Sequence, residues 1–365
     1  MRPARLRTFI SCVVPAIFAS WLTGCSTTGG QWTAHAWKPG DELFRSDSRW
    51  LGADAAYSVP LDNELVLWLF GDTFIGDGSV ARGEAAFIRN SIAIQTGLDV
   101  RDAHITFHWG RNGSAPASFF PATADAWLWP VHGVYRNGAL TLFFTRIVSA
   151  PGGLGFNVVG AAALRCDDIS GEPESWHFQS LALPNTPGAY AMIFGVAVLE
   201  AGGHVYAYCD TELDGHTIYL LRWTAEDFDA GRLAAAGWWN GEDFVYETSL
   251  NGGPAPMFRD GASEFSVHRL ADGRFVQVQS YGFPHSDIAI RTAPRAEGPW
   301  SAPETVFRPR ESKREGTLVY AAKAHPELAG DWMLVTYAAN HFDLQTLLRD
   351  HSLYYPRFVR LKQRH

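Results

Sequence analysis

Residues 53–73 read ADAAYSVPLDNELVLWLFGDT, and the fold can be worked out from this stretch. It contains two apolar segments, 54–61 and 65–72, separated by three polar residues. Apolar segments of this length on either side of a short polar turn predict a β-hairpin. With those three residues as the turn, Asp54 lies opposite Asp72 at the open end of the hairpin. Directly opposed residues have Cβ atoms about 4.5–5.5 Å apart.

Two carboxylates at that distance, beside the rings of Trp68 and Phe70, repel each other and are partly shielded from water. Both conditions raise the pKa of a carboxyl group, and unequal shifts make one acid and one base from the same residue type. The pair Asp54 and Asp72 therefore predicts a catalytic site. The alternative is a surface hairpin in which Asp72 only satisfies strand-end amides through an Asx turn.

The hairpin pattern recurs four more times along the chain, which indicates a repeat architecture. Turn signals such as Asn137-Gly138 and Asp272-Gly273 are strong, because both central residues of these turns need positive φ. The further hairpins span 129–146, 194–211, 264–281 and 320–340. Their predicted facing pairs are Trp129 with Arg146, Gly195 with Asp210, Glu264 with Tyr281, and Tyr320 with Asn340.

More polar strand material follows the first four hairpins, at 89–95 and 105–109, 158–164 and 176–181, 217–223 and 244–247, and 287–292 and 304–307. An apolar inner hairpin with two outer strands is one propeller blade. Five such units over 36–365 predict one all-β domain, a five-bladed β-propeller. The last blade would be closed by residues 42–45 beside 355–361. The alternative architecture is a pair of β-sandwiches.

The inner strands of a propeller begin at one end of its axis, so the open ends of the five hairpins should meet at one mouth. Carboxylates, cations and aromatic rings that meet there suit a sugar, whose C–H face stacks on rings and whose hydroxyls take polar contacts. The candidate substrate-binding residues are Asn90, Trp129, Arg146, Asp210, Tyr281, Tyr320, His325 and Asn340.

Structural alternatives stand beside several of these candidates. Trp129 could belong to the core, and His325 could bond backbone under the turn at Pro326. Asn90 could orient Asp72 or merely cap a strand end, and Arg146 could pair structurally with Asp54 or Asp72, which would lower a pKa.

The N-terminus has the features of an exported lipoprotein. Arg2, Arg5 and Arg7 precede an apolar stretch at 9–22 that is short for a membrane span, and the sequence LTGC ends at Cys25. We expect cleavage after residue 24, lipidation of Cys25, and a tether at 25–35 that anchors the protein to a membrane facing the periplasm or the cell surface. An ordinary secretory signal with a chance cysteine is the alternative.

Charge and cysteine usage bound the function further. Loss of residues 1–24 removes three arginines and no acid, which changes the net charge from −8 to −11 and disfavours nucleic acid as a partner. The sequence has no CxxC or HExxH pattern, so we expect no cofactor and no zinc site. A structural calcium ion would fit an oxygen-rich axial channel. Cys166 and Cys209 could form a disulfide or remain buried thiols, and we expect a monomer.

Six motifs carry a family resemblance, in the order WLFGDTFIG (68–76), RNSIAI (89–94), WPVHGV (129–134), SEFSVHR (263–269), AHPEL (324–328) and YPRFVRL (355–361). With them the chain resembles bacterial five-bladed propeller domains of unknown function, of the DUF4185/DUF5005-like group, which is related to endo-D-arabinanase-type glycoside hydrolases. FGDT with an aspartate eighteen residues upstream is the most specific feature.

The resemblance implies a hydrolase with two catalytic aspartates, Asp54 and Asp72. A looser likeness to five-bladed arabinanases makes Glu264 a third acid or a pKa modulator; an ion pair with Arg269 or Arg291 is its alternative. His132 departs from the family pattern. The expected protein is a glycoside hydrolase that cleaves a furanoside or related linkage in an oligo- or polysaccharide. A non-catalytic surface propeller that binds glycan or protein is the rival. A carboxyl separation of about 5–5.5 Å would indicate retention, and about 6.5–9.5 Å inversion.

Overall fold

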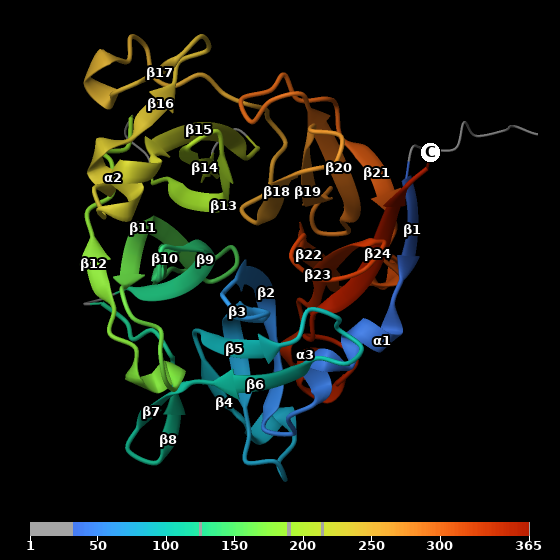
Figure 1. Cartoon of the computed structure of the whole chain (residues 1–365). Coiled ribbons are helices and arrows are strands. Elements are labelled where there is room, and N and C mark those ends of the chain that lie inside the picture. Colours follow the sequence, from blue (N-terminus) through green and yellow to red (C-terminus); the bar gives the residue numbers. More distant parts are fainter. Residues whose placement is uncertain (1–31, 124–125, 188–190, 213–214, 365) are drawn as a thin grey trace, which may run out of the picture.

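A computed structural model of the chain describes residues 32–123, 126–187, 191–212 and 215–364. Five sheets surround a central axis, each with the first strand of its apolar hairpin innermost, which confirms the predicted five-bladed β-propeller (Figure 1). The signal segment, Cys25 and the tether up to residue 31 lie outside the described residues. Within the described ranges, no helix is long and apolar enough to cross a membrane.

The first two blades each follow the predicted order from the axis outward. Blade one consists of β2 (Trp50–Pro60), β3 (Leu65–Ile75), β5 (Ser91–Thr96) and β6 (His104–His108), with β4 (Ala86–Ile88) also paired to β3. A separate small sheet is formed by β7 (Gly110–Asn112) and β8 (Ala115–Ala117). Blade two consists of β9 (Trp127–Arg136), β10 (Ala139–Ser149), β11 (Phe156–Cys166) and β12 (Gln179–Leu181).

Blades three and four continue the ring. Blade three has β13 (Ile193–Ala201), β14 (His204–Thr211), β15 (Thr217–Thr224), β16 (Gly237–Trp239) and β17 (Phe244–Val245). The segment predicted as its fourth strand is therefore a fifth one, because Gly237–Trp239 pairs with β15 first. Blade four has β18 (Phe265–Arg269), β19 (Phe275–Tyr281), β20 (Asp287–Ala293) and β21 (Glu304–Phe307).

Blade five joins the two ends of the described chain. It consists of β22 (Thr317–Ala324), β23 (Met333–His341), β24 (Arg357–Gln363) and, outermost, β1 (Trp32–Ala36). The helices are α1 (Lys38–Asp41), α2 (Ala225–Asp229) and α3 (Leu344–Arg349), with 3₁₀ turns at Leu43–Arg45, Arg82–Glu84, Pro173–Ser175, Leu233–Ala235, Glu247–Ser249 and Arg310–Lys313.

The ring closes by mixing N- and C-terminal strands, as predicted, but the N-terminal partner is different. Strand β1 pairs with β24, with Trp32 opposite Gln363, so residues 32–35 belong to a blade and not to the tether. The segment predicted for this role, 42–45, is largely a 3₁₀ turn. Its Phe44 is fully buried, with its ring 4.9 Å from that of Trp68 in edge-to-face contact. Burial of this ring holds the segment against blade one rather than at a sheet edge.

The inner strands are buried on both faces, as packing between neighbouring blades requires. In β3, Leu67, Trp68, Leu69 and Phe70 are all fully buried although alternate side chains point to opposite faces. Leu67 and Leu69 pack in one core cluster and Trp68 and Phe70 in another. Strand β3 is thereby fixed from both sides, which positions the residues that follow it at the axis.

The first hairpin has the predicted register for most of its length. Tyr57 faces Leu69 and Ala53 faces Thr73, but the ladder shifts twice between these pairs, since Ala55 faces Phe70. Asp54 consequently lies in a β-bulge opposite Gly71 and Asp72 together, and is not in a regular facing pair with Asp72. Positive φ angles of 66° at Ala55 and 59° at Ala56 accompany the shift.

The other four hairpins exist as predicted, but each facing pair is displaced near the axis. Bulges place Thr145 opposite Trp129, Ile193 opposite Asp210, and Ala338 opposite Tyr320. In blade four the displacement comes from the turn. The Leu270 amide donates to the carbonyl of Arg274, so the turn has three residues and not the two predicted, and the pairing moves by one residue. The predicted pairs at the open ends were therefore wrong by one or two residues.

Candidate active site

The open ends of the five hairpins meet at a cavity of about 1070 Å³. It is lined by residues of all five blades, so the predicted convergence on one mouth is correct. Seven predicted site residues line it: Asp54, Asp72, Trp129, Glu264, Tyr281, Tyr320 and Asn340. Four others, Asn90, Arg146, Asp210 and His325, do not.

Asp54 is held by two tyrosines from blade five. The hydroxyl of Tyr320 donates to Asp54 Oδ2 at 2.7 Å, and that of Tyr354 donates to the same oxygen at 3.3 Å. Asn340 Nδ2 in turn donates to the Tyr320 hydroxyl at 3.2 Å. Burial, and then the negative charges of Asp72 and Glu264, raise the pKa of Asp54 to about 8, against the smaller effect of the tyrosine donors.

Asp72 has a different set of neighbours, drawn from the edge of blade one and from blade two. Trp129 Nε1 donates to Asp72 Oδ1 at 2.9 Å, and Arg89 Nη1 lies 3.2 Å from Oδ2. Burial raises the pKa of Asp72 to about 6, and the charge of Arg89, the Trp129 bond and the Arg89 bond oppose this rise. Of the two aspartates, Asp54 thus holds its proton to the higher pH.

Glu264 forms its ion pair with Lys323, not with Arg269 or Arg291. Lys323 Nζ lies 2.8 Å from Glu264 Oε2 and also donates to the carbonyls of Ala55 and Ala321, at 2.6 and 2.8 Å. The Lys323 side chain is 1% exposed, and burial lowers its pKa against the opposing charge of Glu264. This cation connects blades four and five to the bulge beside Asp54.

Gly71 in the FGDT motif is required by the close approach of Asp54. A Cβ on Gly71 would lie 2.5 Å from Asp54 Oδ1, well inside van der Waals contact. With Asp54 as a catalytic carboxyl group, as predicted from the sequence, we expect Gly71→Ala to push the carboxylate aside and lower turnover about 100-fold, because misplacement of a catalytic group by about 1 Å has that effect. The melting temperature should stay within about 2 °C of wild type, since the displaced atom ends a side chain.

The matched control is Gly83→Ala, where an added Cβ meets nothing within 4 Å. Circular dichroism melts and turnover on one substrate are to be measured for both variants. Equal turnover of Gly71→Ala and Gly83→Ala would contradict the role of this close approach.

Asn90 and Arg146 do not contact the aspartates. Asn90 is fully buried; its Nδ2 donates to the carbonyls of Phe120 and Leu128, and its Oδ1 accepts from the Phe120 amide. These three bonds join Asn90 to the chain leading into and along blade two, and none of them reaches Asp72. Arg146 faces Leu128 beside the shifted register of β10, and Arg89 takes the place that was predicted for it.

His325 and His132 do not line the cavity. His325 is 1% exposed, with Ser58 Oγ 2.6 Å from its Nδ1 and Thr336 Oγ1 2.7 Å from its Nε2. Its ring nitrogens bond side-chain hydroxyls, and not the backbone proposed as its alternative. His132 accepts the Val198 amide through Nδ1, and burial lowers the pKa of His132 to about 4.

Asp210 is paired with a histidine that the sequence did not single out. It is fully buried, and its Oδ2 lies 2.7 Å from Nδ1 of His216, which lines the cavity. The bond to Asp210 raises the pKa of His216, and burial raises the pKa of Asp210. The pair thus holds an oriented imidazole at the cavity, whose lining also includes Glu212.

Four residues of the site were missed from sequence: Arg89, Lys323, His216 and Tyr354. Arg89 opens the motif RNSIAI and Tyr354 directly precedes YPRFVRL, so their position beside motifs was the available signal. Lys323 and His216 gave no such signal. Cys166 and Cys209 are free, buried thiols, which settles the alternative left open for them.

The chain was compared with protein families and with solved structures. A family model described as "Domain of unknown function (DUF5005)" matches residues 39–363. A "putative hydrolase" from Bacteroides ovatus superposes with a TM-score of 0.73 at 16% identity, over 95% of this chain and 96% of that one. An α-L-arabinofuranosidase from Podospora anserina, solved with cellotriose, gives a TM-score of 0.51 at 13% identity, over 91% and 97%.

No curated protein matches the chain. At identities this low the structural likeness shows the shared propeller fold, which is distantly similar to that of glycoside hydrolases.

Proposed function

This chain is a member of the DUF5005 family, and from that premise we propose that it is a glycoside hydrolase acting on an oligo- or polysaccharide. One observation carries the proposal: two carboxyl groups in one cavity have pKa values driven apart by different neighbours, to about 8 at Asp54 and about 6 at Asp72. Glycosidases need such a pair, one protonated and one ionised.

The roles follow from the neighbours. Asp54, flanked by negative charge and tyrosine hydroxyls, keeps its proton near neutral pH and protonates the leaving glycosidic oxygen. Asp72, beside the Arg89 guanidinium, is ionised and acts as base or nucleophile on the opposite side of the sugar. Glu264 raises the pKa of Asp54 by its charge, so it is a modulator held in place by Lys323.

The cavity rim supports a sugar chain as the substrate. Large apolar side chains are rarely exposed in the described part of the chain, and most of those that are exposed gather at this cavity. The exposed residues that line it are Phe87, Leu154, Tyr281, Phe283, Phe342 and Leu344. Rings at a mouth provide stacking faces for successive sugars, while Asn340 and His216 offer polar contacts to hydroxyls. The family resemblance in FGDT supports a furanoside or related linkage, and the LTGC sequence at Cys25 supports a lipid-anchored, exported enzyme.

The pH dependence of kcat/KM should be bell-shaped, rising near pH 6 as Asp72 ionises and falling near pH 8 as Asp54 loses its proton. Arg89→Gln should move the rising limb to higher pH, because loss of the cation removes an interaction that lowers the pKa of Asp72. Arg101→Gln, at a surface pair with Asp99, should leave the limb unchanged. The measurement is the pH profile of all three proteins; a rising limb that stays in place in Arg89→Gln argues against Asp72 as the ionised partner.

The proposal is tested by reducing-sugar release from a panel of plant and bacterial polysaccharides that includes arabinans. Wild type should release sugar from at least one, and the double variant Asp54→Asn/Asp72→Asn from none. Binding without hydrolysis, measured by calorimetry on the same panel, would instead identify a glycan-binding propeller. Equal release by the double variant would show that the aspartates are not catalytic.

A further inference from the structure

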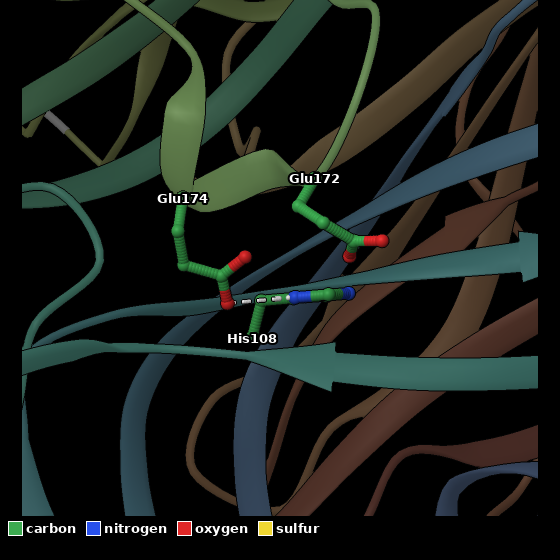
Figure 2. Close-up of side chains that lie close together, drawn as sticks. All are labelled: His108, Glu172 and Glu174. Atoms are coloured by element: carbon green, nitrogen blue, oxygen red, sulfur yellow. Dashed lines mark hydrogen bonds and ion pairs between the residues drawn. The ribbon is translucent and has the colours of Figure 1, made fainter.

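A second group of ligand-type side chains lies on the outer edge of the ring, away from the cavity. His108 is on β6, the outermost strand of blade one, and Glu172 and Glu174 lie between β11 and β12 of blade two. Figure 2 shows both glutamates reaching from one short segment toward the imidazole. One donor atom from each residue lies within 4.8 Å of the other two. Within the described ranges no other group of this kind is present.

The imidazole distinguishes this group from an ordinary acidic surface. The His108 side chain is only 12% exposed, and its Nδ1 lies 2.9 Å from Glu174 Oε1. Its other ring nitrogen, Nε2, is 3.1 Å from Thr106 Oγ1 on the same strand. A metal-ligating histidine is oriented in this way, with the nitrogen that does not bind the metal held by a hydrogen-bond partner.

Glu172 has an exposed side chain that makes no bond of its own within the group. It precedes the 3₁₀ turn Pro173–Ser175, but its side chain makes no capping bond to that turn. No ion pair within the described residues uses its carboxylate, which nevertheless lies beside a second carboxylate and an imidazole. Two carboxylates around one ring leave net negative charge there, and a divalent cation between the three side chains would neutralise it.

We propose that His108, Glu172 and Glu174 bind one divalent transition-metal ion, with Zn²⁺ as the best match, and that this ion clamps the outer edges of blades one and two. One nitrogen and two oxygens with room for water are a zinc donor set, whereas Mg²⁺ and Ca²⁺ prefer oxygen alone. Ligands of tetrahedral zinc lie about 3.4 Å apart. Glu174 Oε1 already lies within this spacing of the His108 ring, at 2.9 Å from Nδ1, so the exposed Glu172 side chain is the ligand that has to move inward on binding.

The test is calorimetry and thermal melting of purified protein that carries no affinity tag, with ZnCl₂ as the probe. Wild type should bind one Zn²⁺ per chain and melt about 2–4 °C higher in 100 µM zinc, with no rise in MgCl₂ or CaCl₂. His108→Gln and Glu172→Gln should lose both effects. His104→Gln, an exposed histidine on the same strand, should keep them.

The readout is the rise in melting temperature that zinc causes in each protein. Because each variant is compared with its own metal-free form, any destabilisation from losing the His108–Glu174 ion pair does not affect this rise. Glu172→Gln breaks no hydrogen bond or ion pair described above, so it keeps the test valid if His108→Gln folds poorly. Absence of zinc binding below about 100 µM by wild type overturns the proposal. Undiminished binding by both variants also overturns it. Neither result bears on the glycosidase assignment, because the group lies outside the cavity.

Discussion

Asp54→Asn should lower hydrolysis of unactivated polysaccharide by roughly 10²–10⁴-fold yet leave dinitrophenyl glycosides as substrates, whereas Asp72→Asn should inactivate both reactions. A dinitrophenolate leaves without protonation, so the general acid is dispensable for it. The group that attacks the sugar, or activates water, is needed for either substrate. This split follows from the neighbours of the two carboxyl groups, since Asp54 has the higher pKa.

Asparagine preserves the shape of each site. Its carbonyl oxygen can still accept from Tyr320 at position 54 and from Trp129 at position 72, so both variants should fold. Steady-state kinetics on a polysaccharide and on the matching dinitrophenyl glycoside supply the measurement. Asp331→Asn, an exposed aspartate in the hairpin turn of blade five, is the control. The opposite pattern, with Asp72→Asn alone rescued by the activated substrate, would exchange the two roles.

Lys323→Met should lower the free energy of unfolding by about 3–5 kcal/mol, the largest stability effect we expect from a single substitution here. Methionine fills a similar volume but leaves three acceptors without their donor, namely Glu264 and the carbonyls of Ala55 and Ala321. The Lys323 ammonium also lies 4.1 Å from the centre of the Tyr57 ring, and that attraction is lost as well.

Urea unfolding measures this loss as a shift in the midpoint, with the dependence of the unfolding free energy on urea concentration unchanged. The control is Lys313→Met, which replaces an exposed lysine. Adding Glu264→Gln to Lys323→Met should recover part of the stability, because the double variant no longer leaves a carboxylate without its cation. A loss below 1 kcal/mol for Lys323→Met would mean that water replaces the ammonium, and would refute its structural role.

The propeller was predictable because its signal is repetition. Five apolar hairpins with turn residues such as Asn137-Gly138 recur along the chain, and burial between blades makes both faces of each inner strand apolar, as in β3. Convergence of Asp54, Asp72 and Glu264 on one mouth follows from that topology alone, without any knowledge of side-chain contacts.

The detailed contacts were not predictable, because bulges leave no pattern in the sequence. One extra residue on a strand exchanges the side chains that face the axis. The bulge in β9, where Val131 and His132 lie opposite Phe143, accounts for Thr145 opposite Trp129, and Arg89 takes the position expected for Arg146. Buried polar residues raise a further difficulty, since Asn90 and His325 resemble site residues in sequence but serve to join neighbouring blades.

The pairing of β1 with β24 has a consequence for how the molecule loses activity. We call this pairing the seam of the ring. The sheet that contains it also supplies Tyr320, and the segment just before β24 supplies Tyr354; both hydroxyls donate to Asp54. Trp32 and Gln363 are brought together across nearly the whole described chain, so this junction has the greatest loop-closure cost in the ring. If the pairing of β1 with β24 opens first on heating, Asp54 loses its two tyrosine donors before the remaining blades separate. For the proposed hydrolase, we therefore expect inactivation at a lower temperature than the loss of β-sheet signal in circular dichroism.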